Sequence, residues 1–228
     1  MKPAVLLGAL LGLFTLFASI PTYASEEGPE LKQPNISMDR ATLQRGVVVF
    51  TETCMGCHSA KYITYRDLID YPEIGLSREA VDDLRGENSL LSGLITELSP
   101  EDAKVSYGTV PPDLSLITRS REGPDYVYSL LTGFEHDPDG RIPDGHYNVY
   151  FPGRNIAMPD PLSWLDHEPE DEEDLKEQAR TVSSFLAFIG EPHQIQRKKI
   201  GLWVMIFLVL FTIVLYALKR EVWKDIKH

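Results

Sequence analysis

The chain contains only two cysteines, and they stand three residues apart in the segment Cys54-Met55-Gly56-Cys57-His58. This is the C-x-x-C-H pattern of covalent c-type haem attachment. Each thiol can form a thioether with one haem vinyl group, and the histidine that follows is then placed to bind the iron through a neutral imidazole nitrogen. The sequence therefore predicts one covalently bound haem c, attached through Cys54 and Cys57, with His58 as an axial iron ligand.

Three other interpretations of the cysteine pair are weaker. A redox-active C-x-x-C normally follows a strand in a βαβ pattern, and no strand is expected before Cys54. A zinc site needs a third and a fourth ligand at suitable spacing, and the remaining histidines are scattered along the chain. A structural disulfide would close so short a loop that it would constrain little of the unfolded chain.

A haem that only carries electrons needs a sixth iron ligand, and Met158 is the best candidate. It lies in Asn155-Ile156-Ala157-Met158-Pro159-Asp160-Pro161, where the prolines stiffen the loop. The other methionines are excluded by position, in the leader, before the haem helix, inside the attachment loop and in a membrane span: Met1, Met38, Met55 and Met205. The alternative is a second imidazole, from His136, His146, His167 or His193. A thioether raises the reduction potential, whereas a second imidazole lowers it.

Both ends of the chain carry apolar runs that are typical of export and membrane anchoring. Residues 5–20 hold no charge and precede Thr22-Tyr23-Ala24, which predicts a cleaved signal peptide over residues 1–24. Residues 200–218 are also uncharged and would span about 29 Å as a helix, close to the ~30 Å of a bilayer core. We therefore expect a periplasmic domain over residues 25–196, a transmembrane anchor over 197–219 and a cytoplasmic tail over 220–228, in a bacterial inner membrane.

The charge of the chain limits its partners. The net charge is -12, and between the two apolar ends 14 basic residues face 32 acidic ones. Nucleic acid is therefore an improbable ligand, and a basic protein is the partner that electrostatics favours. Eight of the carboxylates lie between Asp166 and Glu177. This run is either a solvated surface or a docking site for a basic redox partner.

The exported region is expected to be all-α with long loops. It has no internal repeat and no sustained alternation of apolar and polar residues that would predict a sheet. We expect a helix from Met38 to Cys54 that is capped by Ser37, and a helical apolar stripe from Leu175 to Ile189 that packs against it at Gly46. Shorter helices are expected over 77–84 and 124–132. Ten of the 16 prolines fall in residues 100–169, so most of that stretch should be loop.

Several short segments occur in an order that resembles the cytochrome c1 family, the haem subunits of ubiquinol:cytochrome c reductase. They cover most of the exported region and the anchor. In chain order they are CMGCH at 54, PPDLS at 111, DYVYSLLTGF at 125, YFPG at 150 and IAMPDPL at 156, followed by FLAF, EPH, RKKIGL, the apolar span and LKR.

The resemblance implies a class I cytochrome c fold with long haem-wrapping loops and one C-terminal transmembrane helix. It makes Met158 the distal iron ligand and places Pro111 and Pro112 along the haem edge. It also brings Arg121 to a haem propionate and Tyr126 beside the haem. From the residues alone, Arg121 is equally a solvated surface arginine and Tyr126 a core aromatic. The segment between CMGCH and PPDLS is shorter than in some members of the family.

The function implied by the resemblance is electron transfer rather than catalysis by this chain itself. Single electrons would pass from a Rieske iron-sulfur protein to a basic cytochrome c, with a cytochrome b subunit in the same complex of the respiratory chain. One alternative is a free-standing, membrane-tethered cytochrome c shuttle outside any reductase. A haem peroxidase is disfavoured, because Met158 would fill the open iron position that such an enzyme needs.

Overall fold

The computed structural model describes residues 28–137, 140, 142, 145–163 and 172–224. The predicted signal peptide and the first half of the acidic run, up to residue 171, therefore lie outside the described residues. Residues from Leu31 onward form one compact unit, and before it residues 28–30 have no regular structure. Helix predominates, with little strand, which confirms the predicted all-α class.

Helix α2 (Arg40–Val49) leads directly to the cysteine motif. Its N-cap is Asp39, whose carboxylate accepts a hydrogen bond from the Thr42 amide at 3.0 Å, so the prediction of Ser37 as the cap was wrong. The Ser37 hydroxyl donates to the Asp39 carboxylate instead. After Val49 the chain continues as a π-helical turn, η2 (Phe50–Cys54), in which the Met55 amide donates to the Phe50 carbonyl at 2.8 Å. The predicted helix thus reaches Cys54, but with a wider last turn.

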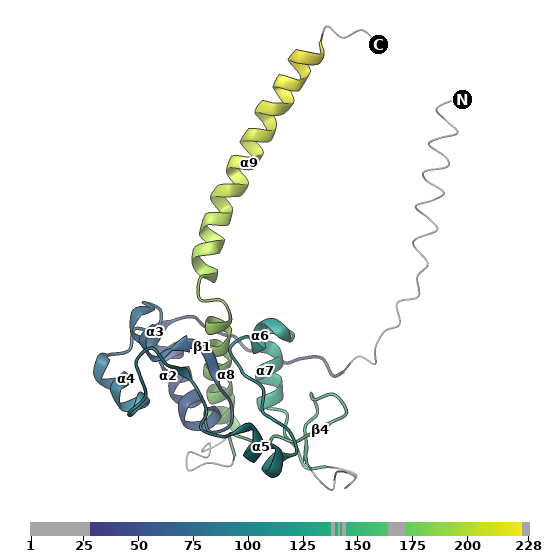
Figure 1. The fold of residues 1–228 in the computed structure, drawn as a ribbon. Coiled ribbons are helices and arrows are strands. Elements are labelled where there is room, and N and C mark those ends of the chain that lie inside the picture. The colour runs from purple at the N-terminus through teal and green to yellow at the C-terminus, as the bar shows by residue number, and fades with distance from the viewer. Residues whose placement is uncertain (1–27, 138–139, 141, 143–144, 164–171, 225–228) are drawn as a thin grey trace, which may run out of the picture. The chain divides into compact units, whose positions relative to one another are not determined.

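Helix α8 (Glu172–Gly190) packs across α2, as the sequence predicted (Figure 1). The contact is closest at Gly46, where a Cβ atom would lie 2.3 Å from the Thr181 carbonyl oxygen and 2.7 Å from Cβ of Phe185. The predicted apolar stripe is confirmed, because its members from Ala179 onward are buried, and the rings of Phe50 and Phe185 lie 5.6 Å apart. The two helices contribute buried residues to one core: Leu43 and Val47 from α2, and Ala179, Val182, Leu186 and Ile189 from α8.

The two shorter predicted helices are also present. Helix α4 (Arg78–Arg85) begins after Ser77, whose hydroxyl accepts from the Ala80 amide at 3.2 Å, and it ends at Gly86. Helix α7 (Gly123–Leu131) ends at Thr132 and packs against α8. Three further helices were not predicted: α3 (Tyr65–Asp70), α5 (Pro100–Tyr107) and α6 (Ile117–Ser120). Two of them lie in the proline-rich stretch, which nevertheless remains mainly loop.

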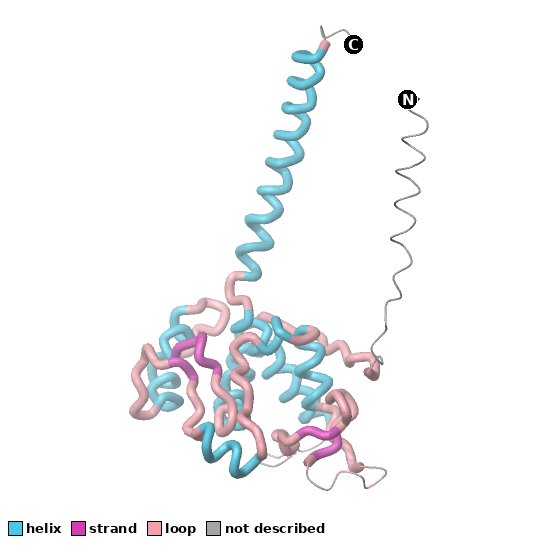
Figure 2. The backbone as a smooth tube through the Cα atoms, turned by 45° about the vertical axis from the view of Figure 1, so that its right-hand side comes forward, coloured by secondary structure: helices cyan, strands magenta, loops and turns pink. Residues whose placement is uncertain are grey.

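Two small antiparallel ladders join loops that flank the cysteine motif and Met158 (Figure 2). Strand β1 (Ala60–Thr64) follows the motif and pairs with β2 (Gly93–Leu94), with Ala60 opposite Leu94. Strand β3 (His146–Tyr147) pairs with β4 (Asn155–Ile156), with His146 opposite Ile156. The second ladder ends two residues before Met158 and so fixes the start of its loop.

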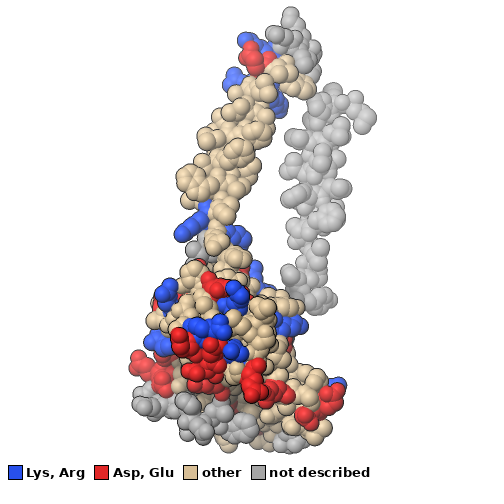
Figure 3. Space-filling view, turned by 60° about the vertical axis from the view of Figure 1, so that its left-hand side comes forward, with Lys and Arg blue, Asp and Glu red and all other residues tan. Residues whose placement is uncertain are grey.

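Helix α9 (Gln194–Trp223) contains the predicted anchor. An 18-residue window within residues 196–223 has a mean hydropathy of 2.6, so this helix is long and apolar enough to cross a membrane. Its large apolar side chains are exposed, and basic side chains lie at both ends of the apolar stretch (Figure 3). These features are those of a single membrane-spanning anchor near the C-terminus.

Candidate haem site

One cavity of about 650 Å³ brings together every residue that the sequence singled out for haem binding. Its volume falls within the ~300–1,000 Å³ of typical cofactor sites. The residues that it collects are Cys54, Cys57, His58, Pro111, Pro112, Arg121, Tyr126 and Met158. They come from the end of η2 and the turn after it, the loop before α6, the junction of α6 with α7, α7 itself and the loop after β4.

The cysteine motif forms a tight loop at one wall of the cavity. The amides of Cys57 and His58 both donate to the Cys54 carbonyl, at 3.1 and 2.8 Å. Both thiols are free, and burial raises the pKa of the Cys54 thiol to about 12. A redox-active dithiol needs a thiolate, which this burial disfavours. Within the described part of the chain, no three His, Cys, Asp or Glu side chains are grouped so as to hold a metal ion, so a zinc site is not supported either.

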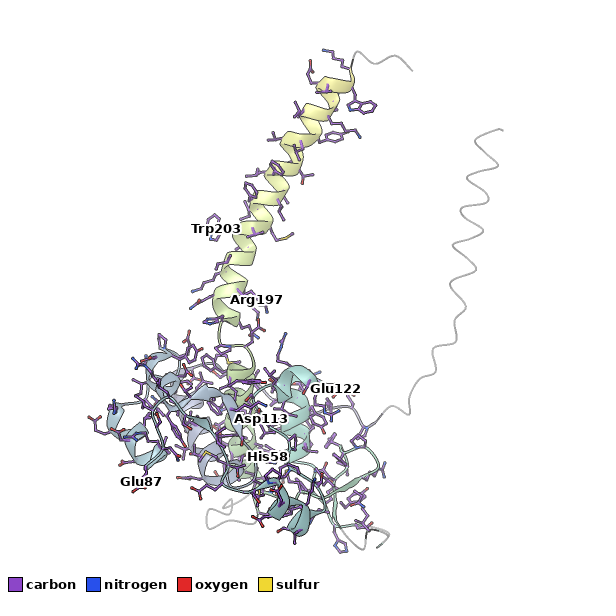
Figure 4. All side chains as sticks on the ribbon, in the orientation of Figure 1. His58, Glu87, Asp113, Glu122, Arg197 and Trp203 are labelled. Atoms are coloured by element: carbon purple, nitrogen blue, oxygen red, sulfur yellow. The ribbon has the colours of Figure 1, made fainter. Side chains whose placement is uncertain are left out.

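His58 is held in one orientation by the main chain of the PPDLS segment (Figure 4). Its Nδ1 lies 2.8 Å from the Pro112 carbonyl oxygen. Because a carbonyl only accepts, Nδ1 carries the proton and Nε2 keeps its lone pair. Burial lowers the pKa of His58, and this outweighs the opposite effects of the Pro112 carbonyl and Asp113. The imidazole is therefore neutral, the form that binds iron.

The loop that carries Pro112 is fastened along β1. The Asp113 carboxylate accepts from the amides of Lys61 at 3.1 Å and Ser115 at 2.9 Å. The Leu114 amide donates to the Ser59 carbonyl at 2.7 Å. These bonds join the residues just after His58 to the residues just after Pro112. The imidazole and the Pro112 carbonyl that orients it are therefore held in place together.

Met158 contributes to the cavity from a loop that is fixed at both ends. Ile156, in β4, is buried, and the Asp160 carboxylate accepts from the Leu162 amide at 3.1 Å and the Ser163 hydroxyl at 2.7 Å. Of the rival histidines, the three within the described residues (His136, His146 and His193) do not line this cavity. His167 lies outside the described residues. The donor set that the cavity presents is two thiols, one neutral imidazole and one thioether, which fits a c-type haem.

Arg121 and Tyr126 lie together at the border of the cavity. The Arg121 guanidinium stands over the Tyr126 ring, 5.9 Å from its centroid. Arg121 is exposed and Tyr126 is half-buried. The contact of Arg121 with a haem propionate stays a prediction, and the Tyr126 ring by itself would hold the guanidinium in this place.

Much of the cavity wall was not predicted. The Tyr107 hydroxyl at the end of α5 lies 3.9 Å from the Cys57 sulfur, and α7 and α8 supply apolar side chains. Helical periodicity indicated that residues such as Val182 and Leu186 are buried, but not that they face a cofactor cavity. Apolar wall residues include Leu114, Ile117, Val127, Leu130, Leu131, Phe151, Ile156, Pro159, Pro161, Val182 and Leu186.

Comparison with known proteins agrees with this geometry. The family model described as the cytochrome C1 family matches residues 30–101 and 94–226. The chain belongs to the cytochrome c1 family. It is 36% identical to cytochrome c1 of Allochromatium vinosum, over 95% of this chain and 98% of that protein. It is 34% identical to cytochrome c1 1, a mitochondrial heme protein of Arabidopsis thaliana, over 99% of this chain and 83% of that protein.

A further relative is the cytochrome b/c1 of Bradyrhizobium diazoefficiens, which is 32% identical over 82% of this chain and 34% of that protein. Family membership makes this chain a haem electron-transfer subunit of the cytochrome bc1 complex, with one covalently bound haem c. It also confirms the resemblance that the ordered sequence motifs indicated.

Proposed function

We propose that this chain passes single electrons from a Rieske iron-sulfur protein to a cytochrome c, with Cys54 and Cys57 attaching the haem and His58 and Met158 binding its iron. The supporting observation is one apolar cavity in the described part of the chain. It gathers the attachment loop, a neutral and oriented imidazole, and a thioether from a hundred residues further along the chain.

The chain prepares this cavity for electron transfer in three ways. A bound haem supplies the one-electron ferric/ferrous couple. The Pro112 carbonyl keeps the His58 Nε2 lone pair available, and the soft Met158 sulfur favours the ferrous state and so raises the reduction potential. The apolar walls exclude water, while the exposed Pro112 and Ala157 leave part of the border open to a partner.

The ligand assignment has a direct spectroscopic test. The oxidised holoprotein should show a weak near-infrared charge-transfer band that disappears in Met158→Leu. The band should persist when His136, His146, His167 or His193 is changed to Gln. A band that survives Met158→Leu, or one that depends on a histidine other than His58, would refute Met158 as the ligand. Covalent attachment requires that the colour stays with the protein in acidic acetone.

The partners within the membrane follow from the family. The Bradyrhizobium relative is named cytochrome b/c1, which supports a cytochrome b subunit as a neighbour of this chain. Purification of this chain from membranes in mild detergent should bring a dihaem cytochrome b and a Rieske protein with it. If a fully haem-loaded chain purifies without either protein, the free-standing shuttle is the correct interpretation.

A basic cytochrome c is the acceptor that the charge of the chain favours. Within the described part of the acidic run, Glu172 pairs with Lys176, and Glu177 pairs with Arg45 and Arg180. The docking role is proposed for the acidic run as a whole, residues 166–177.

The docking proposal is tested by the rate of electron transfer. The rate to a basic cytochrome c should fall as salt rises, and replacing residues 170–174 by their amides should remove much of that dependence. Asp83→Asn with Glu87→Gln, in and after the last turn of α4, removes two negative charges and is the matched control for Glu170→Gln with Asp171→Asn. An equal effect of both sets would mean that only net charge matters, which contradicts a specific docking site.

The domain boundaries and the orientation are part of the same proposal. Residues 25–196 lie in the periplasm of a bacterial inner membrane, and residues 220–228 in the cytoplasm. Mass spectrometry of the mature protein should give an amino terminus near residue 25. In sealed spheroplasts, protease added outside should degrade the haem domain and spare an epitope placed after His228. The reverse pattern would overturn the orientation.

A further inference from the structure

Asn148 is a fully buried polar residue, with 0% of its surface exposed, directly after β3. Its side-chain amide donates to the Leu130 carbonyl at 2.7 Å, and its side-chain oxygen accepts from the Tyr150 amide at 3.0 Å. Its own main-chain amide donates to the Arg154 carbonyl at 3.1 Å, and its carbonyl accepts from Phe151 at 3.3 Å. A buried side chain with this many partners holds its surroundings in one arrangement.

These bonds connect two walls of the haem cavity. Leu130, near the end of α7, lines one wall, and Phe151 and Ile156 line the wall from which Met158 emerges. A further bond, from the Val149 amide to the Gly133 carbonyl at 3.0 Å, joins the same two elements. Among the described residues, the Asn148 amide donates the one side-chain hydrogen bond that joins α7 to the β3–β4 hairpin.

The hairpin that Asn148 holds contains an unfavourable backbone conformation. Arg154 has φ of 59°, the only positive φ of a non-glycine residue in the described part of the chain. Its amide donates to Phe151 at 2.8 Å, and its carbonyl receives the Asn148 amide. A strained turn persists only when its surroundings fix it. Loss of the Asn148 side-chain bonds to Leu130 and Tyr150 should free the main chain at Asn148, weaken its bond to the Arg154 carbonyl and let the turn relax, four residues before Met158.

We propose that Asn148 is a positioning residue for Met158, which sets how firmly the thioether stays on the haem iron. This inference rests on the proposed role of Met158 as a ligand. The hydrogen bond to Leu130 joins the hairpin to a helix end that is itself part of the cavity wall. Asn148 thereby limits how far the Met158 loop can move away from the opposite wall, where His58 is held.

The test uses the full-length holoprotein with Asn148→Leu, a residue of similar volume that has no hydrogen-bonding group. Ferrous iron binds carbon monoxide only after the sixth ligand has left, so the rate of carbon monoxide binding reports release of Met158. We expect this rate to rise about tenfold, which corresponds to about 1.4 kcal/mol. We also expect the near-infrared band of the ferric protein to vanish at a lower pH on alkaline titration. Asn148→Asp, which keeps the acceptor for Tyr150, serves if Asn148→Leu does not accumulate.

Thr64→Ala is the control for general destabilisation. Thr64 forms a capping box with Asp67 at the start of α3, and neither residue lines the cavity. This variant should lower thermal stability and leave the rate of carbon monoxide binding unchanged. The inference is overturned if the Asn148 variants lower thermal stability in the same way without changing ligand release. If the wild-type protein lacks the near-infrared band, the assignment of Met158 fails instead, so the two failures are distinguishable.

Discussion

Replacing Gly46 by alanine tests the contact that joins the two main helices of the haem domain. The new Cβ atom would lie 2.3 Å from the Thr181 carbonyl oxygen and 2.7 Å from Cβ of Phe185. Both distances are far below van der Waals contact. Because one neighbour is main chain and the other is the root of a side chain, no rotamer change can relieve the clash, and α2 and α8 must move apart.

The expected cost is the difference between two effects. Overpacking a close-packed interface costs typically about 1–3 kcal/mol, and contacts with a helix backbone place this variant near the upper end. Alanine in place of glycine recovers about 1 kcal/mol of helix propensity. The net loss in the free energy of unfolding is therefore about 2 kcal/mol, or about 4–8 °C in Tm for a chain of this size.

Thermal unfolding of the detergent-solubilised holoprotein, followed by circular dichroism at 222 nm and by the Soret band, measures this loss. Gly201→Ala in α9 is the matched control, since a Cβ atom there would meet nothing within 4 Å. It should leave the Tm of the haem domain unchanged. If Gly46→Ala were as stable as wild type or more stable, the close approach of α2 and α8 would be wrong.

Three further predictions concern stability. Thr64→Ala removes the Thr64 hydroxyl that accepts from the Asp67 amide, which is one half of a capping box, and should cost about 0.5–2 kcal/mol in chemical unfolding. Phe185→Ala removes a fully buried ring that packs against Phe50 and should lower the free energy of unfolding by about 3–5 kcal/mol. Met158→Leu, the variant that tests iron ligation, should lower it by less. The hydrogen bond from Arg180 lowers the pKa of Glu177, so this pair stabilises the fold above the unfolded pKa near 4.5 and loses its effect as pH falls through the lower folded value. Glu177→Gln should therefore reduce stability by less than about 1 kcal/mol at neutral pH and converge with wild type in acid; equal losses at both pH values would contradict this assignment.

Some of the fold and site could be predicted because the signals are local or strictly periodic. Leu43, Val47 and Phe50 mark one buried face of α2 and η2. Gly46 lies on the same face, and its lack of a side chain indicates that another element packs closely there. The attachment motif is contiguous, and elimination among five methionines leads to the one that lines the cavity.

Other features depend on competition between signals or on tertiary packing. Ser37 and Asp39 can both cap a helix, and the serine hydroxyl bonds to the carboxylate, which leaves Asp39 as the cap. Helix α5 has Ser99 as its N-cap, Pro100 in its first turn and Gly108 as its C-cap. From the sequence, a loop was nevertheless predicted there, because prolines are frequent in the surrounding residues. Ladders of two residues are too short to show alternation. The roles of Tyr107 and Asn148 arise only when distant segments meet.

The hydrogen-bond acceptor that orients His58 is a main-chain oxygen. Substitution of the side chain at that position therefore does not test the contact. Pro112→Ala would retain the Pro112 carbonyl, so a scan of single substitutions would pass over the group that faces the imidazole. Inserting one residue between Pro112 and Asp113, next to the bonds that fasten this loop to Ser59 and Lys61, would instead shift that oxygen out of register with the ring. The contact between His58 and the Pro112 carbonyl is therefore detected by variants that change the spacing of the chain, and not by variants that change one side chain.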